Sequence, residues 1–246
     1  MLFETQRFRQ LIAPHPAYER CLIVVAAPLE ARAVLAGFRC VRNEPESWTS
    51  CRLEVGFELL VCGAGKANAA GATAREIGRS RPDCVLNLGI CGALPNANPL
   101  RVGQSIVASS CLFADDGIDA GARWIPMAQA GFPAAVDADR IEPSAALGRL
   151  FRPLVDRVGV VATVSTCSGT NARSEAISLR CGSEGLAEAM EGAAIGLAAA
   201  RAQIPFAELR VASNRTGDRA DQGWDLPLAL RGLEAIASRI QAVLRA

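Results

Sequence analysis

Short apolar runs alternate with alanine-rich or amphipathic segments along most of the chain. The continuous apolar run at 21–27 is typical of a strand buried on both faces, and Pro28 suits the first turn of a following helix. Further strands are predicted at 51–62 (two short strands joined around Gly56), 83–88, 104–111, 158–165 and 206–213. Further helices are predicted at 66–79, 171–180, 190–202 and 227–245.

This alternation predicts a single three-layer α/β/α domain with a central mixed, largely parallel sheet. We expect residues 1–20 to form an N-terminal extension and residues 21–246 to form the catalytic domain. Prolines and glycines crowd residues 112–143, which predicts an irregular excursion rather than a linker between domains. In sheets of this kind, ligands bind beyond the carboxyl ends of the strands, so polar residues at those ends are the candidates for a site.

Composition narrows the class of protein. The 246 residues are 50% hydrophobic and 21% charged, which is ample for a substantial core in one α/β domain. A net charge of +1 gives no electrostatic reason to expect binding to nucleic acid or to an acidic membrane surface. No apolar stretch approaches the ~20 residues that a spanning helix needs, and the N-terminus lacks the apolar core of a secretory signal. We therefore expect a soluble, cytoplasmic protein.

Cysteine and histidine usage limits the chemistry further. The nine cysteines are scattered, odd in number and without a CxxC pair, so we expect them to fill the core as reduced thiols. The single histidine, His15, lies between two prolines in the expected extension, which argues against a histidine zinc site or a Ser-His-Asp triad. We expect no metal and no cofactor, with catalysis by carboxylates, amides and backbone groups.

The most informative pair of candidates is Glu191 and Asn214. Glu191 stands alone at the mouth of a helix of small apolar residues, and a predicted strand leads to Asn214. A carboxylate can accept hydrogen bonds from a sugar diol, and an amide can read a purine edge. Together they outline a nucleoside-cleaving site.

Three further features are ambiguous when taken singly. Glu30 follows the first strand, where a carboxylate also simply complements a helix dipole. The Gly63-Ala-Gly65 turn fits neither a Walker A loop nor a dinucleotide fingerprint, and a tight strand-to-helix turn explains it equally well. Glycines within 87–93 permit a ligand to approach the backbone at a strand end.

In their order and spacing, these landmarks resemble the nucleoside phosphorylase and nucleosidase superfamily from about residue 20 onward. The matching segments are the strand before Glu30, 63–66, 87–92, 102–107 and 190–194. The resemblance implies a purine nucleoside as the small-molecule partner, and a homo-oligomer, most simply a dimer. Phosphorylases of this superfamily place arginine, and usually serine, where this chain has Asn87 and Ile90. Because a phosphate dianion needs charge-assisted donors, their loss favours water as the nucleophile.

The resemblance also implies roles for individual residues. Glu30 looks like the base that activates the water, and Glu191 like the acceptor for the ribose 2′- and 3′-hydroxyls, with Met190 packing on the sugar. The pocket for ribose and base is expected to include Cys91 and Gly92, with Thr166 and Cys167 opposite them.

Asn214 separates this chain from the related methylthioadenosine/S-adenosylhomocysteine nucleosidases, which carry aspartate there. An amide is no general acid, but its oxygen can accept N7–H while its nitrogen donates to a 6-oxo group, which favours hypoxanthine over adenine. With Gly217-Asp-Arg219 and Trp224-Asp225-Leu226, this feature resembles the futalosine hydrolase branch. That branch releases hypoxanthine and dehypoxanthine futalosine on a route to menaquinone.

Futalosine also carries a benzoate carboxylate. Arg219 and Arg215 are the candidates to bind it, since a guanidinium fork matches a carboxylate. A solvated loop with an Arg219–Asp225 ion pair is the alternative explanation for these charges.

Other functions stay open on sequence alone. A nucleosidase or phosphorylase acting on inosine, methylthioadenosine or S-adenosylhomocysteine is the main alternative, and an inert nucleoside-binding relative is another. A generic α/β hydrolase has no support, because the chain lacks a GxSxG nucleophile elbow.

Overall fold

The computed structural model describes residues 18–121, 123–133 and 139–245. Most of the expected N-terminal extension, including His15, lies outside the described residues. The strands are β1 (Cys21–Val25), β2 (Thr49–Glu54), β3 (Phe57–Val61), β4 (Cys84–Ala93), β5 (Ser105–Phe113), β6 (Gly117–Asp119), β7 (Trp124–Pro126), β8 (Arg140–Ile141), β9 (Arg157–Thr163), β10 (Gly185–Ala189) and β11 (Phe206–Arg215). The α-helices are α1 (Pro28–Gly37), α2 (Lys66–Ser80), α3 (Ala145–Phe151), α4 (Asn171–Cys181), α5 (Gly192–Arg201) and α6 (Leu226–Arg245), with short 3₁₀ turns at Arg152–Leu154 and Arg219–Asp221.

The central sheet is mixed and largely parallel, which confirms the predicted fold class. Its strands run in the order β10-β9-β5-β11-β4-β1-β3-β2, with β8 beside β5. The pairs β3–β1, β1–β4, β4–β11, β5–β9 and β9–β10 are parallel, and β11–β5 is antiparallel. β10 also pairs with β4 in the antiparallel sense, so five strands close on themselves around the end of β4.

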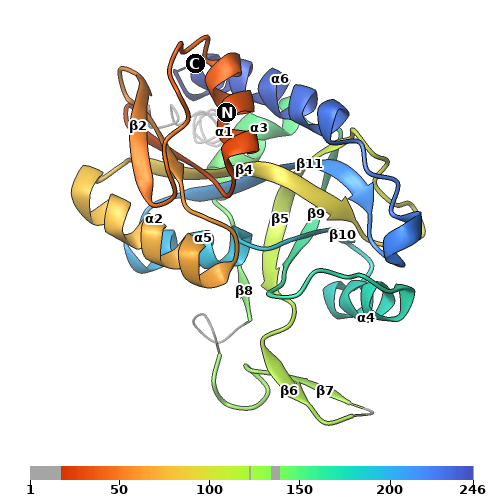
Figure 1. Cartoon of the computed structure of the whole chain (residues 1–246). Helices are drawn as coiled ribbons and strands as arrows, with labels where there is room; N and C mark the ends of the chain where they lie inside the picture. Colours follow the sequence, from red (N-terminus) through yellow and green to blue (C-terminus); the bar gives the residue numbers. More distant parts are fainter. Residues whose placement is uncertain (1–17, 122, 134–138, 246) are drawn as a thin grey trace, which may run out of the picture.

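Two helical layers cover the sheet (Figure 1). Helices α1 and α6 pack on one face, where Val34 and Leu233 join a core with alternate residues of β1 and β4. Helices α2 and α5 pack on the other face, where Ala72 and Ile195 meet the remaining residues of the same strands. Burial on both faces explains why β1 reads as a continuous apolar run.

The sequence predicts most of the longer elements to within a few residues and misses β10, α3 and the short strands β6, β7 and β8, which lie in the segment expected to be irregular. Strand β10 is made of small residues with weak strand propensity, and α3 has only seven residues. The predicted helix at 190–202 begins later, at Gly192, because Glu191 is its N-cap residue. The miss of β10 matters most, because this strand leads directly into the site.

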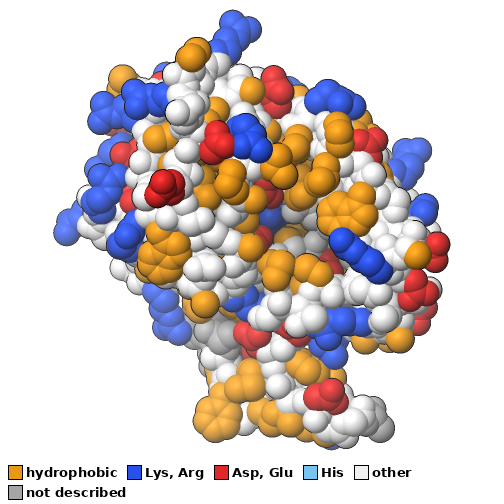
Figure 2. Space-filling model, viewed as in Figure 1, with side chains coloured by type: hydrophobic (Ala, Val, Ile, Leu, Met, Phe, Trp, Pro, Cys, Tyr) orange, Lys and Arg blue, Asp and Glu red, His pale blue; other side chains and the backbone are white. Residues whose placement is uncertain are grey.

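The excursion at 112–143 contains a small hairpin of β6 and β7 that projects from the body of the molecule (Figure 1). Figure 2 shows hydrophobic side chains gathered on this projection, and Ile118 and Phe132 are 48% and 71% exposed. Within the described ranges, no helix combines the length and the apolar character needed to cross a membrane.

Candidate active site

A cavity of about 260 Å³ opens where the carboxyl ends of β1, β4 and β11 meet the end of β10. It is close to the lower end of the ~300–1,000 Å³ typical of small-molecule sites. Figure 2 shows a hollow on this side of the molecule, with charged side chains at its floor and hydrophobic ones around its rim. The lining residues are Ala26, Ala27, Leu29, Glu30, Ala64, Ile90, Cys91, Gly92, Cys167, Glu188, Ala189, Met190, Glu191, Arg210, Ser213, Asn214, Trp224, Leu226 and Leu230.

Glu30 is held rigidly at the floor of the cavity. It lies in the first turn of α1, and its Oε2 accepts hydrogen bonds from the backbone N–H groups of Ala26 and Ala27 at 2.9 and 3.0 Å. Its Oε1 accepts from the N–H of Ile90 at 2.9 Å. Burial raises the pKa of Glu30, and this outweighs the opposing effect of the nearby Arg210 guanidinium. A raised pKa makes the ionised carboxylate a better proton acceptor.

Glu191 is fixed from two sides. Its Oε1 accepts from the N–H of Gly65 at 3.1 Å, so the glycine turn before α2 positions this carboxylate. Its Oε2 lies 3.3 Å from Nη2 of Arg210. Oε2 also accepts from the backbone N–H of Met190 at 3.3 Å, so Oε1 is the oxygen that keeps a lone pair for a ligand hydroxyl.

Arg210 is the functional residue that sequence reasoning missed. Its side chain is only 1% exposed, and its Nε donates to Oε1 of Glu208 at 2.8 Å. Its Nη1 donates to the carbonyl of Ile90 at 3.2 Å, and its Nη2 donates to Oδ1 of Asn87 at 2.5 Å as well as lying beside Glu191. Burial lowers the pKa of Arg210, but the surrounding carboxylates outweigh that effect and raise it above its usual value. The guanidinium is therefore charged, and four of its five N–H donors are used by the protein.

Gly89 is required for this arrangement. A Cβ at this position would collide with Nη1 of Arg210 and Oε1 of Glu30. Because Gly89 has no side chain, the Arg210 guanidinium and the Glu30 carboxylate can both lie close to the backbone of β4.

The charge of the cavity is unusual for a phosphate site. Among the described residues, its charged lining side chains are three carboxylates, Glu30, Glu188 and Glu191, and one guanidinium, Arg210. Glu208 behind Arg210 adds a further carboxylate. An excess of negative charge repels a phosphate dianion and stabilises positive charge that develops on a ligand.

Asn214 lies near the end of β11, buried, with its orientation fixed. Its Nδ2 donates to the carbonyl of Arg215 at 2.8 Å, and because a carbonyl only accepts, the nitrogen must face it. The hydroxyl of Ser213 lies 2.9 Å from Oδ1. One N–H and one lone pair of Asn214 stay available to a ligand in the cavity.

Cysteine thiols in the lining are poor nucleophile candidates. Burial raises the pKa of Cys91 to about 12, and burial also raises the pKa of Cys167. Both thiols are therefore neutral near pH 7, and they contribute apolar surface to the cavity lining.

The structure brings together most of the residues predicted from sequence. Lining the cavity are Glu30, Cys91, Gly92, Cys167, Met190, Glu191 and Asn214. Thr166 does not line it: this residue is exposed, and its backbone N–H and carbonyl are bound by Asp115 and Arg173. The one-residue difference arises because the loop after β9 turns only Cys167 inward.

Arg219 lies outside the cavity lining, but it contacts a residue that belongs to it. Its guanidinium lies 5.3 Å from the ring centre of Trp224, which lines the cavity and is 47% exposed. Oδ1 of Asp225 accepts from the N–H of Leu228 at the start of α6. Arg219 is exposed, and among the ion pairs of the described residues Arg219–Asp225 does not occur; Nη1 of Arg219 donates instead to Oε1 of Gln222 at 3.0 Å.

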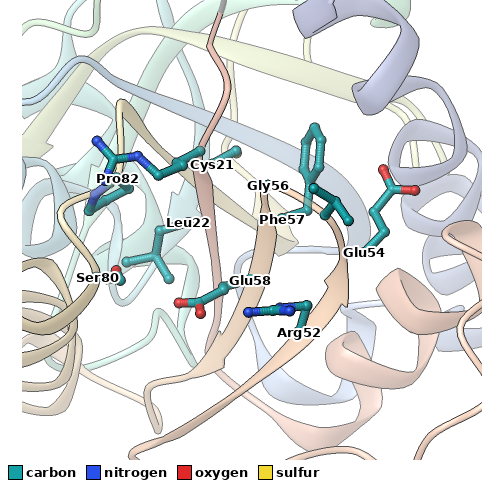
Figure 3. A pocket seen from close by; sticks show the side chains of 11 residues that line it. Cys21, Leu22, Arg52, Glu54, Gly56, Phe57, Glu58, Ser80 and Pro82 are labelled. Atoms are coloured by element: carbon teal, nitrogen blue, oxygen red, sulfur yellow. The ribbon is translucent and has the colours of Figure 1, made fainter.

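A second hollow lies at the opposite end of the sheet, around the first residues of β1 and β3 (Figure 3). Its charged lining side chains are Arg20, Arg52, Glu54 and Glu58. Two of them are paired: Arg20 binds Asp83 at 3.0 Å, and Glu58 lies 3.2 Å from Arg79. This hollow lies at the amino ends of the strands, whereas ligands of such sheets bind at the carboxyl ends. The cavity at the carboxyl ends is therefore the candidate active site.

Comparison with known proteins identifies the family of this chain. The family model of the phosphorylase superfamily matches residues 21–246. The chain belongs to the phosphorylase superfamily. It is 36% identical to a futalosine hydrolase of Acidothermus cellulolyticus over 217 residues, 87% of this chain and 86% of that protein. It is 32% identical to a futalosine hydrolase of Streptomyces coelicolor, over 91% of this chain and 95% of that protein.

Among solved structures, the fold is similar to the 5′-methylthioadenosine/S-adenosylhomocysteine nucleosidase of Neisseria meningitidis, solved with methylthio-immucillin-A. The TM-score is 0.69 at 22% identity, covering 92% of this chain and 98% of that one. At this identity the likeness concerns the superfamily fold, and the chemistry of the site rests on this chain's own residues.

Proposed function

We propose that this protein is a nucleosidase that hydrolyses the N-glycosidic bond of futalosine and releases hypoxanthine. The observation that carries the proposal is the position of Arg210 among carboxylates: Glu208, Asn87, Glu191 and the Ile90 carbonyl take four of its five N–H donors. Because carboxylates outnumber this single guanidinium in the described lining, a phosphate dianion is repelled and water is the nucleophile. The named activity of the Acidothermus and Streptomyces relatives supports futalosine as the substrate.

In the proposed mechanism, the Glu30 carboxylate takes a proton from a water that attacks the anomeric carbon. The bond to the purine nitrogen breaks, its electron pair passes into the base, and N7 takes up a proton from solvent. Glu191 accepts hydrogen bonds from the ribose hydroxyls and, with Glu30, stabilises the positive charge that develops on the sugar ring. Met190 packs against the sugar.

The base is assigned from the free groups of Asn214. Because its Nδ2 already faces the Arg215 carbonyl, its remaining N–H and the oxygen lone pair can pair with O6 and N7–H of hypoxanthine. Adenine has a 6-amino group in place of O6, so two N–H donors would face each other. This mismatch would cost about 1–3 kcal/mol in the free energy of binding.

The benzoate of futalosine is assigned to the mouth of the cavity at Trp224. The indole offers a flat surface to the aromatic ring, and Arg219, which lies over the same indole, can pair with the carboxylate. Arg215 is exposed and contacts the carbonyl of Asp221, so it is the second candidate.

We also propose that the enzyme acts in the cytoplasm as a homodimer. Nine free cysteines fit a reducing compartment. Ile118 of the projecting hairpin and Phe132 just after it are exposed, and a second copy of the chain can cover them; sedimentation equilibrium measures the oligomeric state.

The proposal is tested by incubating the protein with futalosine, inosine and methylthioadenosine, with and without phosphate, and measuring the free base. Futalosine is expected to be the best substrate, with no need for phosphate. A requirement for phosphate, or a preference for methylthioadenosine, favours the alternative phosphorylase or nucleosidase.

A further inference from the structure

Glu188 is a buried carboxylate in the cavity that the proposed mechanism does not use. It lies in β10, is 5% exposed, and lines the same cavity as Asn214. Its Oε1 accepts from the N–H of Ser168 at 2.8 Å, and its Oε2 accepts from the Ser168 hydroxyl. Both donors come from one residue, so the carboxylate is oriented and each oxygen keeps a lone pair.

The sheet places Glu188 and Asn214 on either side of one glycine. Gly92 of β4 is the register partner of Glu188 in β10 and also of Asn214 in β11. Directly paired residues point to the same face of a sheet. Two strand spacings separate their Cα atoms, about 10 Å.

Packing confirms which face this is. Ala187 and Ala189, the neighbours of Glu188, belong to the core under α2 and α5, so the alternation of the strand turns Glu188 to the other face. A Cβ on Gly92 would lie 3.5 Å from Nδ2 of Asn214 and 2.7 Å from Cγ2 of Thr216. Gly92 thus forms the floor between the carboxylate and the amide, beside the Thr216 methyl group that takes up the space of a side chain.

A 6-oxopurine on this floor has one polar group that Asn214 does not satisfy. Asn214 pairs with N7–H and O6, while N1–H, on the far side of O6, is a donor that needs an acceptor. Glu30 and Glu191 lie beside Arg210, at the sugar end of the cavity. Glu188 is the carboxylate on the base side.

We propose that Glu188 accepts the N1–H of hypoxanthine and so acts with Asn214 as a specificity-determining residue for 6-oxopurines. The inference rests on the proposed function, because it takes hypoxanthine as the base released. Adenine carries no hydrogen at N1, so its N1 lone pair would face the lone pairs of Glu188 as well as meeting the wrong donor at Asn214. Two mismatches in place of one make the discrimination steeper than Asn214 alone gives.

Burial raises the pKa of Glu188, against the lowering effect of the Ser168 hydrogen bonds. A donor at N1 favours the ionised carboxylate, so binding of hypoxanthine and ionisation of Glu188 support each other.

The test measures dissociation constants of free hypoxanthine and free adenine by calorimetry. In Glu188→Gln, the amide oxygen still accepts from Ser168, but its NH₂ group can face N1. Hypoxanthine binding is expected to weaken roughly tenfold to a hundredfold, while adenine binding stays the same or tightens. Equal weakening of both bases, or unchanged hypoxanthine binding, overturns the proposal and leaves Glu188 as an anchor for the Ser168 loop.

Ser168→Ala is the matched comparison, because it removes one of the two hydrogen bonds that orient Glu188 but keeps the carboxylate. It is expected to change the selectivity between the two bases less than Glu188→Gln does, and a change as large as that of Glu188→Gln contradicts the assignment. The unaltered protein gives a further measurement: 1-methylhypoxanthine, which lacks N1–H, is expected to bind at least tenfold more weakly than hypoxanthine. Equal binding of the two overturns the proposal.

Free bases are used so that two failures stay distinguishable. A protein that discriminates the bases through Glu188 but does not cleave futalosine refutes the proposed substrate alone. A protein that cleaves futalosine but shows no selectivity change in Glu188→Gln refutes the role of Glu188 alone.

Discussion

Nη2 of Arg210 lies 3.3 Å from Oε2 of Glu191, and both side chains are almost completely shielded from water. This ion pair links the residue expected to bind the ribose to the cation that offsets part of the negative charge at the floor of the cavity. It also explains how the site holds several carboxylates close together: the guanidinium supplies compensating charge.

Removing that cation is expected to destabilise the fold. Arg210→Met leaves the Glu208 and Glu191 carboxylates buried without their partner, which costs about 3–5 kcal/mol in the free energy of unfolding. Urea denaturation at pH 7 measures it. Arg219→Met, on the surface, is the control and is expected to change stability by less than about 0.5 kcal/mol. Equal stability of the two variants contradicts the account of Arg210.

Glu30→Gln is expected to abolish most turnover while ligand binding survives. The amide keeps the size of the side chain but cannot take a proton from water, so kcat on futalosine should fall by roughly 10²–10⁴-fold. Binding of free hypoxanthine does not require proton abstraction by Glu30. Its dissociation constant should therefore stay within a few-fold of the value for the unaltered protein. A near-normal kcat in this variant refutes the assignment of Glu30 as the base.

The pH profile should carry the signature of Glu30. Its pKa is raised by burial above the usual 4.5, and the reaction needs the ionised form. As the pH falls through that raised pKa, Glu30 gains a proton and kcat/KM declines, so the acid limb should have its midpoint above pH 4.5. Stopped assays across pH 4–8, with stability checked at each pH, locate it. A limb at or below the ordinary value contradicts a desolvated base.

Arg219→Ala should separate futalosine from inosine. Inosine has no benzoate, so loss of the guanidinium beside Trp224 is expected to raise KM for futalosine roughly tenfold while leaving KM for inosine nearly unchanged. Steady-state kinetics on both substrates with the same preparation provide the internal control. An equal rise for both substrates removes Arg219 from substrate recognition.

Sequence patterns are most informative here where burial leaves a clear imprint. Strand β1 can be predicted because it is buried on both faces and its sequence is a continuous apolar run. Helix α2 can be predicted because its sequence is rich in alanine. Strand β10 is not, because its Gly-Leu-Ala-Glu-Ala sequence derives its conformation from pairing with β9 and β4. Tertiary pairing overrides weak local propensity there.

The site shows the same division. Glu30, Glu191 and Asn214 can be found from sequence, because each is a polar residue at a strand or helix end. Arg210 looks like an ordinary residue of a buried strand, since its partners Asn87 and Glu191 are 123 and 19 residues away. Its local signal is a pair of opposite charges, Glu208 and Arg210, two residues apart in a buried strand. Such a residue in a buried run must find compensating groups elsewhere in the fold.

Hydrolysis of futalosine in ¹⁸O-labelled water tests the central claim most directly. If water activated by Glu30 is the nucleophile, one labelled oxygen appears at the anomeric carbon of the sugar product, and hypoxanthine is released at the same rate with or without phosphate. An unlabelled sugar phosphate that forms only when phosphate is added, or no hypoxanthine at all, contradicts the account.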